Sequence, residues 1–203
     1  MKRPWIIALT GVALLFLCSG CALTRFRASG QVPVQPVCQP ADARQSALVL
    51  WGPVWRPDQK EVPQREAAAQ QGIEGFFADG NCFASAQVRR LPGDRQAQPP
   101  SDDQMRALAV QGDPPPDRVV VILVRELGPV IQILGPIAAF GGGTMVELDL
   151  VSLDARNRSA PARFSIHWHN GGSLVFKGVA TLPHDMTESL HQALRLEAPA
   201  ELR

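Results

Sequence analysis

The chain has 203 residues, of which 20 are basic and 19 are acidic, giving a formal net charge of +1. This near balance argues against nucleic acid as a partner, because nucleic-acid binding needs a clustered basic face. The length suits a single domain, and a domain of this size buries about 70% of the surface of its unfolded chain.

The N-terminus has the features of a secretory signal. Lys2 and Arg3 precede an apolar run from Trp5 to Leu17, which is shorter than the roughly 20 apolar residues of a transmembrane helix. A basic start followed by an apolar run of about 7–15 residues is typical of a signal peptide. We therefore predict that residues 1–20 are a signal peptide.

Small residues Ser19 and Gly20 stand directly before Cys21. This resembles the bacterial lipobox, whose cysteine is lipidated on sulfur and becomes the new N-terminus. The departure from the pattern is Cys18, which stands where leucine is usual. The resemblance implies a lipid on Cys21 and, because Ala22 rather than Asp follows, an outer-membrane location facing the periplasm. The alternatives are cleavage after Ala22 and retention of the segment as an N-terminal anchor.

Residues 21–45 are predicted to form a lipid-anchored stalk. From Thr24 to Arg44 the chain contains three prolines and no helical or alternating period, which is typical of an extended linker. Cys38 in this segment and Cys82 further along form an even pair, and an oxidising compartment favours a disulfide between them. The alternative is two unpaired thiols, because the sequence does not show that they are close in space.

The folded domain is predicted to span residues 46–203. It begins with a short strand at 46–55, which Gly52-Pro53 interrupts. A helix is predicted over 64–80, with Gly80 as its C-cap, and a second strand over 81–91. Ser101 and Gln104 form a capping box that starts a second helix.

Three β-rich runs complete the predicted sheet. Residues 118–127 are almost continuously apolar, as in a central strand buried on both faces, and residues 144–154 alternate strictly. Residues 163–178 indicate a hairpin around Asn170-Gly171. Asp185 and Glu188 then indicate an acidic capping box for a last helix. The predicted fold is an α/β sandwich with a mixed sheet, a late antiparallel meander and about three helices.

This order of elements on a lipid-anchored stalk resembles the periplasmic domains of the amino-terminal part of TolB and of the curli-secretion lipoprotein CsgG. The similarity covers residues 46–196 and includes the opening strand, the helix after it and the late strand VELDLVSLDARN. The resemblance implies an α/β fold and a role in envelope assembly, and it transfers no functional residues.

The segment from Leu127 to Val146 contains no charged residue. Its Gly-Pro pairs and three consecutive glycines break any helix. One interpretation is two buried strands joined by a Gly-Pro turn, with the triple glycine as a second turn. The other is an exposed apolar hairpin for self-association or for contact with a partner or a membrane, with Ile137 and Phe140 as contact residues.

Trp51 and Trp55 stand near the end of the first strand, with Arg56 beside them. Aromatic rings in such a position can stack on a glycan or hold a partner, so we predict Trp55 and Arg56 as contact residues. The alternative is that the tryptophans pack in the core or at its rim.

No recognisable catalytic motif is present in the sequence. His167 and His169 flank Trp168 on a predicted strand, so both imidazoles project from one face. With His184 or His191 they would supply three nitrogen ligands for a metal. We predict a non-catalytic outer-membrane lipoprotein without a cofactor that binds or assembles with other envelope proteins. The alternative is a metal-dependent periplasmic enzyme that uses His167 and His169.

Overall fold

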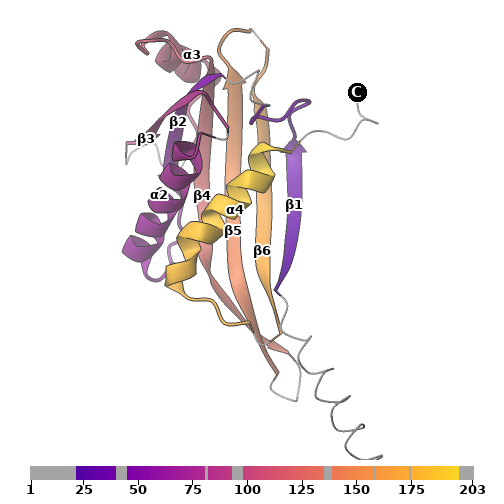
Figure 1. Ribbon diagram of the computed structural model, residues 1–203. Coiled ribbons are helices and arrows are strands. Elements are labelled where there is room, and N and C mark those ends of the chain that lie inside the picture. The colour runs from indigo at the N-terminus through magenta and orange to yellow at the C-terminus, as the bar shows by residue number, and fades with distance from the viewer. Residues whose placement is uncertain are drawn as a thin grey trace, which may run out of the picture.

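The computed structural model describes residues 22–39, 45–80, 82–92, 98–134, 139–157, 159–173 and 175–196 (Figure 1). The elements in chain order are β1 Leu23–Gln31, β2 Ser46–Pro53, α2 Val62–Ala78, β3 Ser85–Arg90, α3 Asp102–Val110, β4 Arg118–Leu134, β5 Ala139–Asp154, β6 Ala162–Ser173, a 3-10 turn Val179–Thr181 and α4 Leu182–Leu194.

The strands form one six-stranded sheet in the order β1-β6-β5-β4-β2-β3. β2 pairs in parallel with β3 and with β4, whereas β4-β5, β5-β6 and β6-β1 pair antiparallel. The parallel pairs follow from the crossovers through α2 and α3, and the late strands form a meander. The predicted α/β class with a mixed sheet is confirmed.

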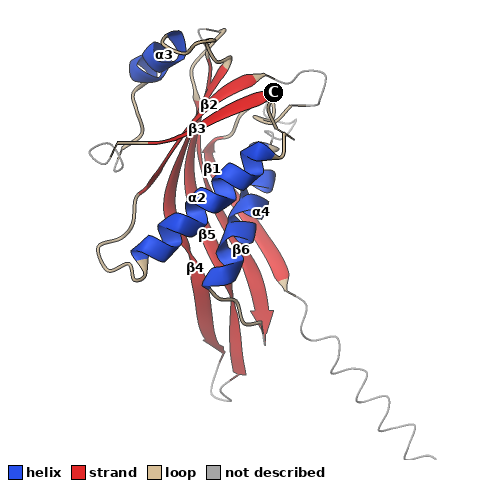
Figure 2. Ribbon diagram, turned by 60° about the vertical axis from the view of Figure 1, so that its left-hand side comes forward, coloured by secondary structure: helices blue, strands red, loops and turns tan. Residues whose placement is uncertain are grey.

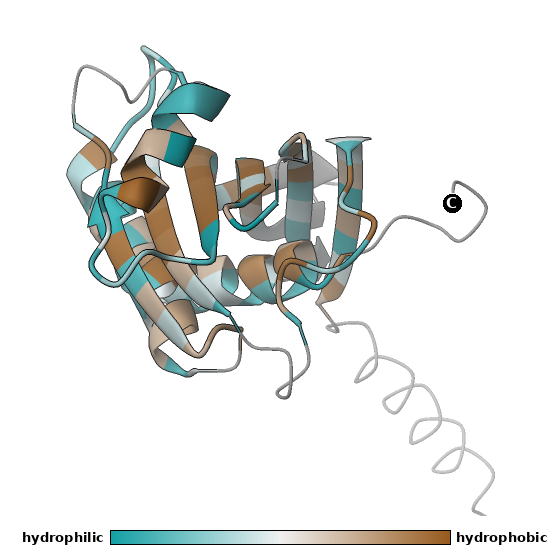
Figure 3. Cartoon of the chain, turned by 90° about the horizontal axis from the view of Figure 1, so that it is seen from above, coloured by the Kyte–Doolittle hydropathy of each residue, from teal (hydrophilic) through white to brown (hydrophobic). Residues whose placement is uncertain are grey.

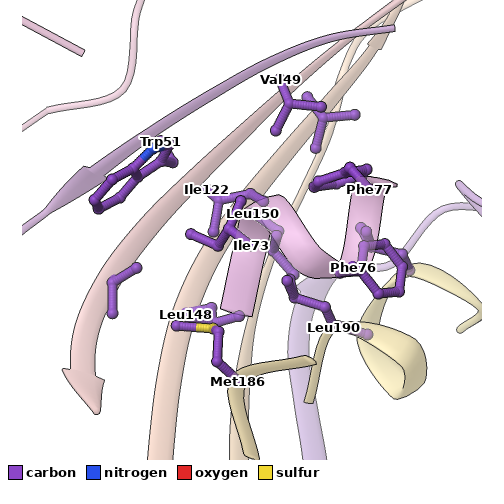
Figure 4. Close-up of a cluster of buried hydrophobic side chains, with 14 of the residues drawn as sticks. Val49, Trp51, Ile73, Phe76, Phe77, Ile122, Leu148, Leu150, Met186 and Leu190 are labelled. Atoms are coloured by element: carbon purple, nitrogen blue, oxygen red, sulfur yellow. The ribbon is translucent and has the colours of Figure 1, made fainter. Parts of the chain in front are cut away.

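Helices α2 and α4 pack side by side on one face of the sheet (Figures 1 and 2). Their apolar residues meet those of β2, β4, β5 and β6 in the main core (Figure 4). A Cβ at Gly72 of α2 would lie 2.6 Å from the Cβ of Met186 in α4, so this glycine allows the two helices to approach closely. None of the described helices is long and apolar enough to cross a bilayer.

Helix α3 packs on the other face of the sheet, near one end (Figure 2). Met105 and Ala109 of α3 contact a second, smaller cluster that includes Leu48, Leu50 and Val121. Hydrophobic and hydrophilic residues both occur along the strands (Figure 3). The part of this face that α3 leaves uncovered includes the polar residues Arg27, His167 and Glu147.

The structure differs from the predicted stalk at its first residues. Leu23–Gln31 forms the edge strand β1, which pairs with β6 from Leu23↔Gly171 to Gln31↔Arg163. An edge strand exposes one side and buries little apolar surface. Its composition therefore resembles that of a linker, although β1 belongs to the sheet.

The predicted hairpin at residues 163–178 is wrong. Asn170 and Gly171 lie within β6, where Asn170 pairs with Thr24 on one side and Thr144 on the other. Pairing on both sides overrides the local turn preference of Asn-Gly. The three glycines at 141–143 are likewise strand residues of β5 and not a turn.

The capping predictions had different outcomes. The Ser101–Gln104 capping box is present at the start of α3, and Gly80 adopts a left-handed conformation, with φ +63°, just after α2. The predicted Asp185 cap is wrong, because α4 begins at Leu182 and Asp185 lies inside its first turns. A capping box of four residues marks the start of a helix only where the residues before it cannot be helical. Leu182 and Pro183 can be, because proline is tolerated in the first turn of a helix.

Cys38 and Cys82 are joined by a disulfide, as the sequence predicted. Both cysteines are buried, and the backbone N–H of Cys38 donates to the carbonyl of Leu194 at 2.8 Å. The segment between β1 and β2 is therefore fixed both to the start of β3 and to the end of α4.

Candidate functional site

The uncovered face of the sheet is formed by β1, β6 and β5. Residues directly opposite each other on antiparallel strands project to the same side, and the register brings together three rows of exposed or half-buried side chains. We call this surface the open face; its rows are Arg25-His169-Met145, Arg27-His167-Glu147 and Ser29-Ser165-Asp149.

Polar contacts on the open face involve mainly β5 and β6. His167 Nδ1 lies 3.0 Å from Glu147 Oε1, and Ser165 Oγ donates to Asp149 Oδ1 at 2.7 Å. Arg125 of β4 pairs with the same Asp149 carboxylate. These contacts hold the two carboxylates of β5 in place.

Arg25 and Arg27 of β1 have no ion pair with any described carboxylate within 4.0 Å. Both side chains are exposed at the outer edge of the open face. The β1 side of this face therefore carries positive charge without an ion pair, across β6 from the carboxylates of β5. This asymmetry suits recognition of a surface with complementary charge.

Two shallow depressions lie on the open face. One is lined by residues of β1, β5 and β6 around Arg27, Glu147 and His167. The other lies next to it, around Arg25, Val130 and His169. Both are open to solvent, so the surface suits contact with another macromolecule better than enclosure of a small substrate.

His169 lies on β6 between Arg25 and Met145, with one nitrogen, Nε2, buried and without a described partner. Burial lowers the pKa of His169 below its usual value, and electrostatic repulsion from neighbouring basic groups, of which Arg25 is the first, lowers it further. The neutral imidazole is therefore favoured, and the ring adds no positive charge to the open face near neutral pH.

The four histidines of the metal hypothesis do not meet. His167 and His169 lie on the open face, whereas His184 and His191 lie on α4, on the opposite side of the sheet. The ring of His191 packs against Phe76 at a centroid distance of 4.8 Å. Within the described part of the chain, no three His, Cys, Asp or Glu residues are grouped to hold a metal ion.

Trp55 and Arg56 lie in the connection between β2 and α2. Trp55 is partly buried against the main core, and its indole N–H donates to Glu66 Oε1 at 3.3 Å. Arg56 is exposed and pairs with Glu126 at 3.0 Å. Trp55 packs partly against the core, and Arg56 is exposed although it pairs with Glu126. Contact of either residue with a partner stays a prediction.

The structure does not describe the side chains of the remaining predicted residues. Cys21 and Ile137 lie outside the described residues. The backbone of Phe140 pairs with Ile133 in β5, and its side chain lies outside the described part. Lipidation of Cys21 and contacts through Ile137 and Phe140 stay predictions.

Sequence reasoning missed Arg25 and Arg27 as residues of the open face. The signal was the period-two alternation of Arg25, Arg27 and Ser29 with Phe26 and Ala28, which indicates a half-exposed strand. The prolines that follow led to an interpretation of the whole segment as a linker.

A buried polar cluster was also missed. Asp185 is 2% exposed and accepts hydrogen bonds from Thr144 Oγ1 and Lys177 Nζ, both at 2.6 Å. It joins β5, the loop after β6 and α4. Its donors lie 41 and 8 residues away in the sequence, so no local pattern could have indicated it.

Comparison with known proteins assigns no family. No family model and no curated protein matches the chain. Among solved structures, the chain is similar to a PelC dodecamer subunit from Paraburkholderia phytofirmans, with 14% identity, 87% of this chain and 100% of that chain covered, and a TM-score of 0.42. It is also similar to lipoprotein GNA1162 from Neisseria meningitidis, with 13% identity, 72% and 96% covered, and a TM-score of 0.38. Hypothetical protein CT253 from Chlamydia trachomatis has 12% identity, 62% and 72% covered, and a TM-score of 0.41.

Proposed function

We propose that this protein is a non-catalytic lipoprotein of the bacterial outer membrane, which docks on other envelope proteins through its open face. The observation that carries the proposal is the position of β1. This strand begins at Leu23, two residues after the predicted lipid site Cys21, and is paired with β6 from its first residue.

A lipid on Cys21 would hold the sheet itself at the bilayer. Two extended residues span at most about 7 Å, so no long linker separates the anchor from the sheet. The open face would then stand beside the membrane at a fixed height. A fixed height and orientation suit a protein that binds neighbours in the same envelope, because less orientational freedom is lost on docking.

The open face also has the chemistry of a docking surface. It carries charges of both signs, and within the described part of the chain its Arg25 and Arg27 are exposed without an ion pair. Complementary charge mainly determines which partner binds and how fast. Trp55 and Arg56 stay proposed contacts at a separate position of the same protein, and Ile137 and Phe140 stay proposed contacts from the sequence.

Cys21→Ser should abolish lipid attachment. Cells grown with a clickable fatty-acid analogue should give a labelled wild-type protein that sediments with the outer membrane, because two or more acyl chains make the attachment stable. The Cys21→Ser variant should carry no label. Label that survives Cys21→Ser and disappears in Cys18→Ser would show that the other cysteine is the anchor.

The docking proposal predicts cross-links from the open face. A photoreactive benzophenone amino acid in place of Arg27 or His167, in the full chain in cells, should give adducts with an envelope protein. The matched control is Glu74, an exposed residue on α2, on the opposite side of the sheet. Equal adducts from Glu74 would contradict docking through the open face, as would the absence of adducts from both open-face positions. An adduct of twice the mass of the chain would identify the partner as a second copy.

A further inference from the structure

Exposed apolar side chains gather at one end of the sheet. Leu23 at the start of β1, Ile131 near the end of β4 and Phe176 after β6 are 59%, 78% and 78% exposed. They are three of the five large hydrophobic residues that are exposed in the described part of the chain. We call the part of the molecule that carries them the anchor end, because β1 begins there.

The strand register places these residues at one level of the sheet, with β6 and β5 between Leu23 on β1 and Ile131 on β4. Leu23 pairs with Gly171, Gly171 with Gly143, and Gly143 with Val130, so Ile131 lies one position beyond the level of Leu23. A Cβ at Gly142, the partner of Ile131, would lie 2.6 Å from the carbonyl oxygen of Val175, the neighbour of Phe176. The residues therefore share one end of the sheet, although they are far apart in the sequence.

The β4-β5 hairpin extends beyond this level. From Val130 the strand continues to Leu134, and four residues at about 3.3 Å each add about 13 Å. The ends of β4 and β5 project past α2 and α4 (Figure 1). Cys21 precedes Leu23 by two residues, and two extended residues span at most about 7 Å. The lipid-bearing sulfur can lie beyond Leu23 by no more than this span plus the length of one cysteine side chain. The hairpin thus reaches at least as far as the proposed lipid site.

The anchor end combines an uncharged tip with arginines close behind it, as in proteins that bind at a membrane interface. The chain has no charged residue from Leu127 to Val146, so the described part of the hairpin beyond Leu127 carries none. Arg25 and Arg27 lie two and four residues along β1 from Leu23, in the direction away from the anchor end. Apolar residues inserted at the headgroup boundary, with cations directly above them, are attracted both by burial and by anionic lipid.

We propose that the anchor end is a second, protein-made membrane contact, in which Leu23, Ile131 and Phe176, together with the paired ends of β4 and β5, insert into the interface of the bilayer. The proposal deepens the proposed function and rests on its anchor at Cys21. In this proposal, lipid covers the apolar anchor end. Two membrane contacts, the lipid on Cys21 and the anchor end, then fix the orientation of the open face.

The test uses the full chain reconstituted into mixed vesicles of phosphatidylethanolamine and phosphatidylglycerol. An environment-sensitive fluorescent amino acid replaces Ile131 or, as the matched control, Val110, which is 79% exposed on α3 at the other end of the sheet. Lipids with brominated acyl chains should quench most of the fluorescence at position 131 and leave position 110 unchanged. Equal quenching at both positions, or none at 131, would overturn the proposal.

Fatty-acid labelling of the same preparations separates this proposal from the lipid anchor. A labelled protein without quenching at position 131 would keep the anchor and overturn the hairpin contact. Quenching at position 131 in an unlabelled protein would support the hairpin contact and contradict lipidation of Cys21. A probe at 131 that is shielded from aqueous iodide but not quenched by brominated lipid would show that protein covers the anchor end, and it would overturn the proposal.

Discussion

Glu126→Ala should destabilise the domain by about 3–5 kcal/mol. Glu126 and Arg65 are 5% and 9% exposed, and Arg65 Nη1 donates to Glu126 Oε1 at 3.0 Å. Removal of the carboxylate leaves the Arg65 guanidinium buried beside carbonyl groups alone, without a compensating charge. Arg56 and Gln59 also lose an acceptor, at 3.0 Å and 3.1 Å. The free energy of unfolding in urea measures the loss.

Asp58→Ala is the matched control for this experiment. Asp58 pairs with Arg56 of the same cluster at 3.8 Å, but its side chain is 81% exposed, so its removal should cost less than about 1 kcal/mol. The double variant Arg65→Met with Glu126→Leu should recover much of the stability, because it removes both buried charges. A Glu126→Ala protein within about 1 kcal/mol of the wild type would contradict this account of the pair.

The strands that could be predicted are those in which the pattern of apolar and polar residues reflects which side chains are buried. Residues 119–124 are apolar at every position, and all of them are buried between α2 and α4 on one side and α3 on the other. The alternation of residues 144–154 corresponds to one face against the main core and one face in the open face or the smaller cluster. In both cases the pattern is a direct consequence of the fold.

The elements that could not be predicted depend on distant partners. β1 was missed because it buries one partly exposed aromatic, Phe26, and gains its order from pairing with β6, about 140 residues later. Asn170-Gly171 has the local preference of a turn, but a strand lies on each side of it. A local pattern carries no information about such neighbours.

Only the part of the candidate site that lies on a single strand could be predicted from the sequence. His167 and His169 were correctly placed on one face of one strand, because this follows from period two alone. That Arg25 and Arg27 lie opposite them follows only from the register of β1 against β6. The open face is therefore a product of pairing between the two ends of the chain.

Removal of the disulfide in a Cys38→Ala, Cys82→Ala double variant should destabilise the domain by about 4 kcal/mol, the chain-entropy value for a loop of this size. The bond joins residues 44 positions apart, so the reduced unfolded chain gains considerable freedom. Its loss should also loosen the connection that follows β1, because Cys38 holds this connection against Leu194 and Cys82. Since β1 has only β6 as a neighbour in the sheet, this edge should show the largest rise in amide hydrogen exchange.

Thermal unfolding with and without reductant measures the effect of the disulfide. The wild type should lose stability on reduction, whereas the double variant should be indifferent to reductant and resemble the reduced wild type. Ser159→Ala, an exposed change far from the bond, controls for substitution itself. Quantitative alkylation of Cys38 and Cys82 in non-reduced wild type would refute the bond. An unchanged exchange rate in β1 of the double variant would show that pairing with β6 alone orders this edge, and that the anchor and the open face stay connected without the disulfide.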